Sequence, residues 1–179
     1  MRASPFLVVL TLAGALLGGA AAGQPADSSG RNAAPPGDPA TFVRFAASSA
    51  TLQVTASEQA VRESSRPDVK DFAQHAIQVQ RDLLSGVQAF ARQSGIAVPA
   101  ALVLEHKASL DGLTPLTGEE FNRRYMQMEV QALRQAVQMY RAAAERATDE
   151  NLRRLAGEAL PKLEQQSSDA DRVAAAVQP

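Results

Sequence analysis

Two glutamines occupy positions that point to a role inside a helical protein. Gln80 lies within a series of apolar residues at helical spacing, namely Val69, Phe72, Ala76, Leu83, Val87 and Phe90. Gln166 interrupts a second such series farther along the chain. Buried amides need hydrogen-bond partners. We expect Gln80 and Gln166 to bond to each other or to water and fix the register of two helices. The alternative is a buried polar pocket that holds a small ligand.

The sequence offers few ligands for a metal ion. Cysteine is absent, and the two histidines, His75 and His106, do not occur in a Glu-x-x-His pair of the kind that di-metal bundles use. A lone histidine on a helix flank is more often exposed or hydrogen-bonded than a ligand. Three methionines stand at core spacing and are interpreted as packing residues: Met126, Met128 and Met139. We therefore expect no cofactor and no metal site.

The remaining polar residues form no recognisable catalytic set. Acidic residues off the apolar stripes are interpreted as solvated and paired with arginines: Glu58, Glu63, Glu129, Glu145 and Glu158. Helical spacing places no histidine near the serines of two Ser-Ser pairs, Ser48, Ser49, Ser64 and Ser65. There is no Gly-x-Ser-x-Gly elbow and no glycine-rich phosphate loop. The sequence predicts that the protein is not an enzyme.

Four long helices are predicted after residue 38. Asp38 and Pro39 open the first, which ends near Ser64, and Pro67 opens the second, which ends before Gly95. A longer connection follows, with room for a short helix over 100–110. Thr117 and Glu120 have capping-box spacing at the start of the third, and the fourth begins at Asp149. The pattern predicts an all-α four-helix bundle.

Pro161 falls in the middle of the fourth predicted helix. A proline there removes a backbone hydrogen bond and crowds the preceding turn, so we expect a kink within one continuous helix.

The N-terminus has the pattern of a secretory signal peptide. Arg2 precedes an apolar run over 6–17, and small residues follow up to Gly23. We expect cleavage near Ala22 and Gly23, a flexible tether over 23–38 and a bundle domain over 39–176. The alternative is an uncleaved anchor. With cleavage, no transmembrane helix is expected to remain, and the protein is predicted to reside in the bacterial periplasm or cell envelope.

The charge balance argues against nucleic acid as a partner. The chain has 18 Lys and Arg against 19 Asp and Glu, a formal net charge of −1. Binding to phosphate backbones needs an excess of basic side chains. The absence of cysteine also excludes disulfides and lipid attachment at a cysteine.

Several short segments resemble a known family of exported ferritin-like proteins, domain of unknown function 4142 (DUF4142). The segments are Phe42-Val43, Val69-Lys70-Asp71-Phe72-Ala73, Gly95-Ile96-Ala97-Val98-Pro99, Leu116-Thr117-Gly118-Glu119-Glu120-Phe121-Asn122-Arg123-Arg124-Tyr125, Val130-Gln131-Ala132 and Leu160-Pro161-Lys162-Leu163. The resemblance covers about 41–173. It implies a ferritin-like four-helix bundle with a longer connection between the second and third helices.

The resemblance also implies three histidine positions that this chain does not keep. They correspond here to Gln80, Leu133 and Gln166. A metal-binding or redox function, the alternative for such a bundle, is disfavoured by this loss. The leading hypothesis is a non-enzymatic envelope protein that binds a protein, a peptide or a small ligand, and a stress-related helper role without a small ligand is a third possibility.

Overall fold

The computed structural model describes residues 37–178, and these residues form five α-helices and no strand. The helices are α1 (Pro39–Glu63), α2 (Pro67–Gln93), α3 (Leu104–Asp111), α4 (Gly118–Arg146) and α5 (Glu150–Ala176). The predicted all-α class is therefore confirmed. The expected signal peptide over 1–22, the cleavage site near Ala22 and Gly23, and the expected tether up to residue 36 lie outside the described residues.

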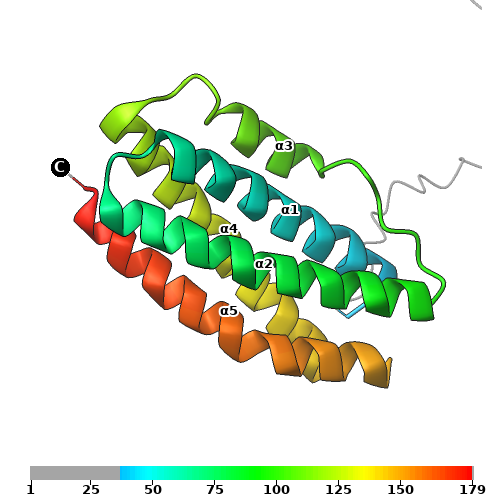
Figure 1. Ribbon diagram of the computed structural model, residues 1–179. Helices are drawn as coiled ribbons and strands as arrows, with labels where there is room; N and C mark the ends of the chain where they lie inside the picture. Colours follow the sequence, from blue (N-terminus) through cyan, green and yellow to red (C-terminus); the bar gives the residue numbers. More distant parts are fainter. Residues whose placement is uncertain (1–36, 179) are drawn as a thin grey trace, which may run out of the picture. The chain divides into compact units, whose positions relative to one another are not determined.

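The four long helices form a closed ring around one core (Figure 1). α1 pairs with α2 and α4 with α5, and further contacts between α1 and α4 and between α2 and α5 complete the ring. Phe42 near the start of α1 packs on Tyr140 near the end of α4, with ring centroids 4.9 Å apart. Arg66, just before α2, donates to the carbonyl of Ala176 at the end of α5. Each helix is therefore antiparallel to both neighbours.

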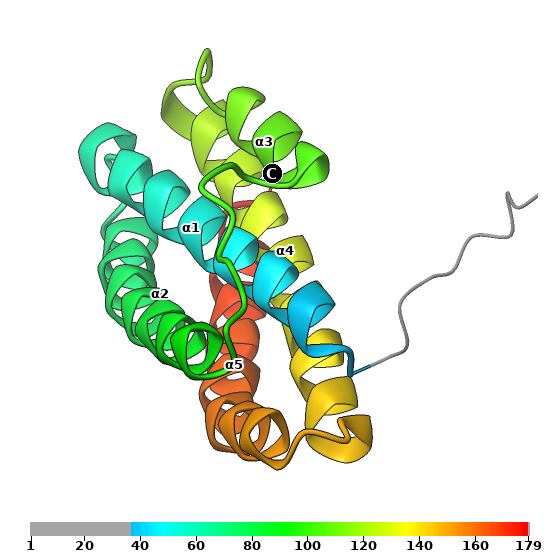
Figure 2. The same ribbon diagram turned by 90° about the vertical axis from the view of Figure 1, so that its right-hand side faces the viewer.

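This arrangement requires one long crossover. α1 and α4 are antiparallel, as are α1 and α2, so α2 and α4 run in the same direction, and the chain must return along the bundle between them. Figure 2 shows this connection running beside α1 and carrying the short helix α3. Two hairpins joined by one crossover are the topology of ferritin-like bundles. The predicted longer connection between the second and third long helices is confirmed.

Side-chain caps define two of the helix starts. Asp38 accepts a hydrogen bond from the Thr41 amide at 2.7 Å, and Asp149 accepts one from the Leu152 amide at 2.9 Å. These bonds satisfy amides that the first turn of a helix leaves free. Both starts agree with the sequence prediction.

The capping box expected at Thr117 and Glu120 does not form. Thr117 is the N-cap residue of α4, but its side chain makes no capping hydrogen bond. Gly118 has a positive φ of 59° at the first helical position, a conformation that glycine adopts without strain. The chain therefore enters α4 through a left-handed turn, which is not the geometry of a capping box.

Pro161 lies inside α5, which continues as one helix on both sides of it. Figure 1 shows the red-to-orange ribbon of α5 changing direction along its length. Proline has no amide hydrogen, so the carbonyl of Gly157 loses its helical donor. Gly157 is exposed, and water can take the place of that donor.

The apolar stripes predicted from the sequence face the core. Among the largest fully buried side chains are Leu52 of α1, Phe121, Tyr125 and Met126 of α4, and Leu163 of α5. No helix within residues 37–178 is long and apolar enough to cross a membrane.

Candidate functional site

Polar side chains cross the middle of this apolar core. Gln80 of α2 donates both hydrogens of its amide nitrogen, one to Gln53 Oε1 of α1 at 3.0 Å and one to Gln166 Oε1 of α5 at 2.9 Å. The side chains of Gln80, Gln53 and Gln166 are 2%, 0% and 1% exposed, respectively. The structure thus brings Gln80 and Gln166 into direct contact and adds a third glutamine.

The chain of bonds continues into α1. Gln53 Nε2 donates to the hydroxyl of Ser49 one turn earlier, at 3.1 Å. We refer to Ser49, Gln53, Gln80 and Gln166 as the amide cluster. In its last member both N–H donors are unused, because Gln166 Nε2 is buried and has no hydrogen-bond partner among the described residues.

A second buried group lies one helical turn away along α1. Ser57 is four residues after Gln53, and its hydroxyl lies 2.8 Å from the hydroxyl of Tyr125 and 3.4 Å from Glu129 Oε1. The side chains of Ser57, Tyr125 and Glu129 are each 0% exposed. We refer to these three residues as the carboxyl cluster, which connects α1 to α4.

The carboxyl cluster is held in its neutral form. Burial raises the pKa of Glu129 from 4.5 to about 8, while the hydrogen bond from Ser57 lowers this pKa to a smaller extent. Burial, together with the neighbouring Glu129, raises the pKa of Tyr125 well above 10. Both groups therefore keep their protons at pH 7. Glu129 Oε2 has no partner within residues 37–178, so the bundle interior holds an acid that is only partly hydrogen-bonded.

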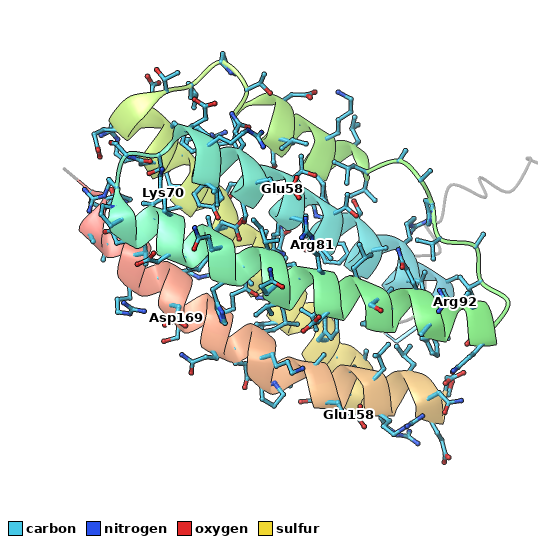
Figure 3. The ribbon with its side chains drawn as sticks, viewed as in Figure 1. Glu58, Lys70, Arg81, Arg92, Glu158 and Asp169 are labelled. Carbon is cyan, nitrogen blue, oxygen red and sulfur yellow. The ribbon has the colours of Figure 1, made fainter. Side chains whose placement is uncertain are left out.

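The prediction that Glu129 is solvated and paired with an arginine is wrong. Glu129 follows Met126 by three residues and precedes Leu133 by four, so it lies on the second apolar stripe of α4 and turns inward. For Glu58, in contrast, the prediction of a solvated acid paired with an arginine is correct. Its carboxylate is 2.6 Å from Arg81 Nη2 on the outer face of α1 and α2, where Figure 3 labels both residues.

Sequence reasoning also missed Gln53 and Ser57. A signal for them was present, because Ser49, Gln53 and Ser57 recur every four residues beside the apolar stripe that includes Leu52 and Ala56. Such spacing places polar residues on one line along a helix. The line faces inward because α1 is covered by α2 on one side and by α4 on the other.

The two histidines have different environments. His75 is exposed on α2, whereas His106 of α3 is 3% exposed and its Nδ1 lies 2.8 Å from Ser48 Oγ. Helical spacing places no histidine near Ser48. The crossover nevertheless brings His106, which is 58 positions away in the chain, into contact with it. Ser48 Oγ also accepts the Val103 amide at 2.9 Å and is buried, so the pair anchors α3 to α1.

The interior polar residues do not fit the metal centre of a ferritin-like bundle. Such a centre needs ionised carboxylates and imidazoles, whereas the positions here hold amides, a protonated Glu129 and the fully buried Leu133. No three side chains of His, Cys, Asp or Glu come together as metal ligands anywhere in the described part of the chain. The amide and carboxyl clusters are thus a neutral hydrogen-bonded interior.

The family of this chain is decided by a match over most of its length. The family model described as domain of unknown function DUF4142 matches residues 24–173. The chain belongs to this family. The predicted membership in the DUF4142 family is therefore confirmed. No curated protein matches the chain.

Solved structures share the fold of this DUF4142 protein at low sequence identity. A DUF305 fragment from Deinococcus radiodurans has a TM-score of 0.68 at 17% identity, covering 79% of this chain and 99% of that one. A DUF305 protein from Streptomyces coelicolor has a TM-score of 0.64 at 18% identity, covering 78% and 93%. CopM in its Cu(II)-bound form has a TM-score of 0.65 at 15% identity, covering 78% and 97%. These likenesses establish the helical bundle fold.

Proposed function

We propose that this protein is an exported, non-enzymatic bundle of the bacterial cell envelope that acts by binding another protein or a peptide through its outer surface. The observation that carries the proposal is the closed, neutral interior. Gln53, Gln80 and Gln166 bond to one another with almost no exposed surface, and the buried Glu129 keeps its proton. Recognition therefore falls to the surface of the helices.

The chemistry of the polar residues supports the absence of catalysis. A catalytic group must reach a substrate and carry a suitable charge or nucleophile. Glu129 and Tyr125 are buried and neutral, and Ser48 is occupied by the Val103 amide and by His106. The signal-peptide pattern around Arg2 and the apolar run over 6–17 supports export.

The proposal is tested by photo-crosslinking in living cells. A photoreactive amino acid replaces one exposed glutamine at a time, Gln78 on α2, Gln127 on α4 or Gln165 on α5. We expect one defined adduct that forms from one face and is absent from the others. The envelope fraction should contain a chain that begins near Gly23. Adducts from no face, or an uncleaved chain in the cytoplasm, would contradict the proposal.

A second candidate function is binding of copper or silver. It is favoured by the shared fold with CopM, whose solved structures hold Cu(II), Cu(I) or silver. In this chain His106, Met128 and Glu105 line one cavity of about 60 Å³ between α1, α3 and α4. Imidazole and thioether groups are ligands that Cu(I) and Ag(I) accept.

Elemental analysis separates the two candidates. The untagged protein is purified from the envelope and measured by mass spectrometry before and after denaturation, with His75→Ala and His106→Ala variants beside it. The leading proposal expects no stoichiometric metal in any sample. A stoichiometric copper or silver content that His106→Ala abolishes and His75→Ala retains would establish the second candidate instead.

A further inference from the structure

Between residues 121 and 144 the outer face of α4 carries basic and amide side chains without an exposed carboxylate, and the exposed acids of this helix, Glu119, Glu120 and Glu145, lie near its ends. From residue 121 to residue 144 the single acid is Glu129, which is buried and protonated. The exposed residues on this stretch are Arg124, Gln127, Gln131, Arg134, Gln135, Gln138 and Arg141. Because the fold buries Glu129, the exposed side chains of α4 between residues 121 and 144 carry only positive charge.

Part of this face forms one wall of a groove against the last turns of α5. The groove has a volume of about 400 Å³, and its α4 wall is built from Arg124, Gln127, Gln131 and Arg134. The opposite wall is built from Asp171, Gln178 and two small side chains, Ala174 and Ala175. Volumes of this size are typical of ligand sites. The small alanines leave room for a backbone to approach closely.

The charges in the groove favour a carboxylate ligand. Arg134 Nη2 donates a hydrogen bond to Asp171 Oδ1 across the groove at 2.8 Å. The other N–H donors of Arg134 remain available. Arg124 also lines the groove, its Nη2 lies near Gly112 at the end of α3, and no hydrogen bond or ion pair joins it to another residue within 37–178. Two guanidinium groups against one carboxylate leave the groove with a net positive charge. Arginine is well suited to carboxylates because its planar donors match both oxygens.

The spacing along α4 sets the length of the ligand. Arg124 and Arg134 are ten residues apart, which corresponds to about 15 Å along a helix. An extended peptide covers that distance in roughly four to five residues. Gln127 and Gln131 lie between the arginines and carry both a donor and an acceptor, so they can pair with the amide and carbonyl groups of such a peptide.

We infer that the groove between α4 and α5 binds an extended acidic peptide segment of a partner protein, with carboxylates four or five residues apart facing Arg124 and Arg134. The inference rests on the proposed function, because it names the surface and the partner chemistry of that same binding role. Recognition is electrostatic at the two ends and uses hydrogen bonds to the peptide backbone between them.

The probe is a synthetic, terminally blocked peptide, Glu-Ser-Thr-Ser-Glu, titrated into ¹⁵N-labelled protein purified from the envelope. We expect amide shifts confined to residues 124–134 and 171–178, with weaker binding as salt is added. Arg124→Ala should weaken binding about fivefold, since it removes one exposed ion pair. Arg154→Ala, at the other end of α5, is the matched control and should leave the affinity unchanged. The peptide with both glutamates replaced by glutamine should not bind.

Shifts elsewhere on the surface, equal binding of the glutamine peptide, or no binding at all would overturn the inference. Photo-crosslinking distinguishes this result from failure of the proposed function. If the peptide does not bind the groove while a defined partner adduct forms from Gln78 or Gln165, the groove assignment fails and the binding function stands. If no face yields an adduct, the binding function itself fails.

Discussion

Gln80 Nε2 on α2 lies 2.9 Å from Gln166 Oε1 on α5, although the two residues are 86 positions apart in the chain. The same nitrogen donates to Gln53 Oε1 on α1 at 3.0 Å. One side chain therefore ties three helices together at one level of the bundle. A shift of any of these helices by one turn would break these bonds, so the amide cluster defines the register of the bundle.

Gln80→Leu is expected to destabilise the bundle by about 2–4 kcal/mol, because it leaves the buried oxygens of Gln53 and Gln166 without donors. The triple substitution Gln53→Leu, Gln80→Leu and Gln166→Leu should cost much less than the sum of the single substitutions, since it removes donors and acceptors together. Urea unfolding followed by circular dichroism measures both. The exposed Gln78→Leu is the control and should change stability by less than about 0.5 kcal/mol. Additive costs would contradict the network.

Glu129 should make the bundle less stable as the pH rises. Its pKa is about 8 in the folded protein against 4.5 for an unperturbed glutamate, so between these values the unfolded chain releases a proton that the folded protein retains. The free energy of unfolding should therefore fall by about 1.4 kcal/mol per pH unit over that interval. The contribution of protonated Glu129 to the free energy of unfolding is complete below pH 4.5 and is lost as the pH passes 8.

Glu129→Gln tests this assignment, because the amide keeps the shape of the side chain and cannot ionise. Its unfolding free energy, measured in urea at several pH values across the interval between the two pKa values, should vary less steeply than that of the wild type. The exposed Glu164→Gln should follow the wild-type slope. Parallel curves for Glu129→Gln and the wild type would show that the carboxyl is not protonated in the folded state.

Ser48→Ala should release the crossover without unfolding the bundle. The Ser48 hydroxyl accepts the Val103 amide at 2.9 Å and contacts His106 Nδ1 at 2.8 Å, so its loss removes two links between α1 and the crossover. Hydrogen exchange should become at least several-fold faster at residues 103–111, while α2 and α5 keep their protection. Ser109→Ala, at a half-buried position on α3, is the control. Uniformly faster exchange in all helices would instead indicate global destabilisation.

Gly37→Ala should destabilise the protein, because the residue has a φ of +94° and an added Cβ would lie 2.9 Å from Ala147 Cα. We expect a cost of at least about 1 kcal/mol from the strained backbone and the contact together.

Gly157→Ala is the matched substitution for which the opposite change in stability is expected. Gly157 is in the helix α5 with nothing within 4 Å of an added Cβ, so the substitution should stabilise by about 0.5–1 kcal/mol. Thermal unfolding of both variants reports the difference, and equal shifts in Tm would be inconsistent with the tight turn.

The sequence by itself determined the elements and the direction of their apolar faces. Asp38 and Asp149 mark helix starts through local hydrogen bonds, and the stripe that includes Phe72 and Gln80 shows its buried face through helical periodicity. These signals are local, since they depend on residues within a few positions of one another. The all-α class and the long connection could therefore be predicted.

The tertiary structure decided how the polar residues are used. The contact of Ser57 with Tyr125 joins residues 68 positions apart, and that of Ser48 with His106 joins residues 58 positions apart. Each depends on which helices are neighbours and on their register, which periodicity within one helix does not contain. The charge of Glu129 was misjudged for the same reason, because its pKa depends on burial by other helices. Local sequence thus fixes helices and their faces, whereas packing fixes partners and protonation.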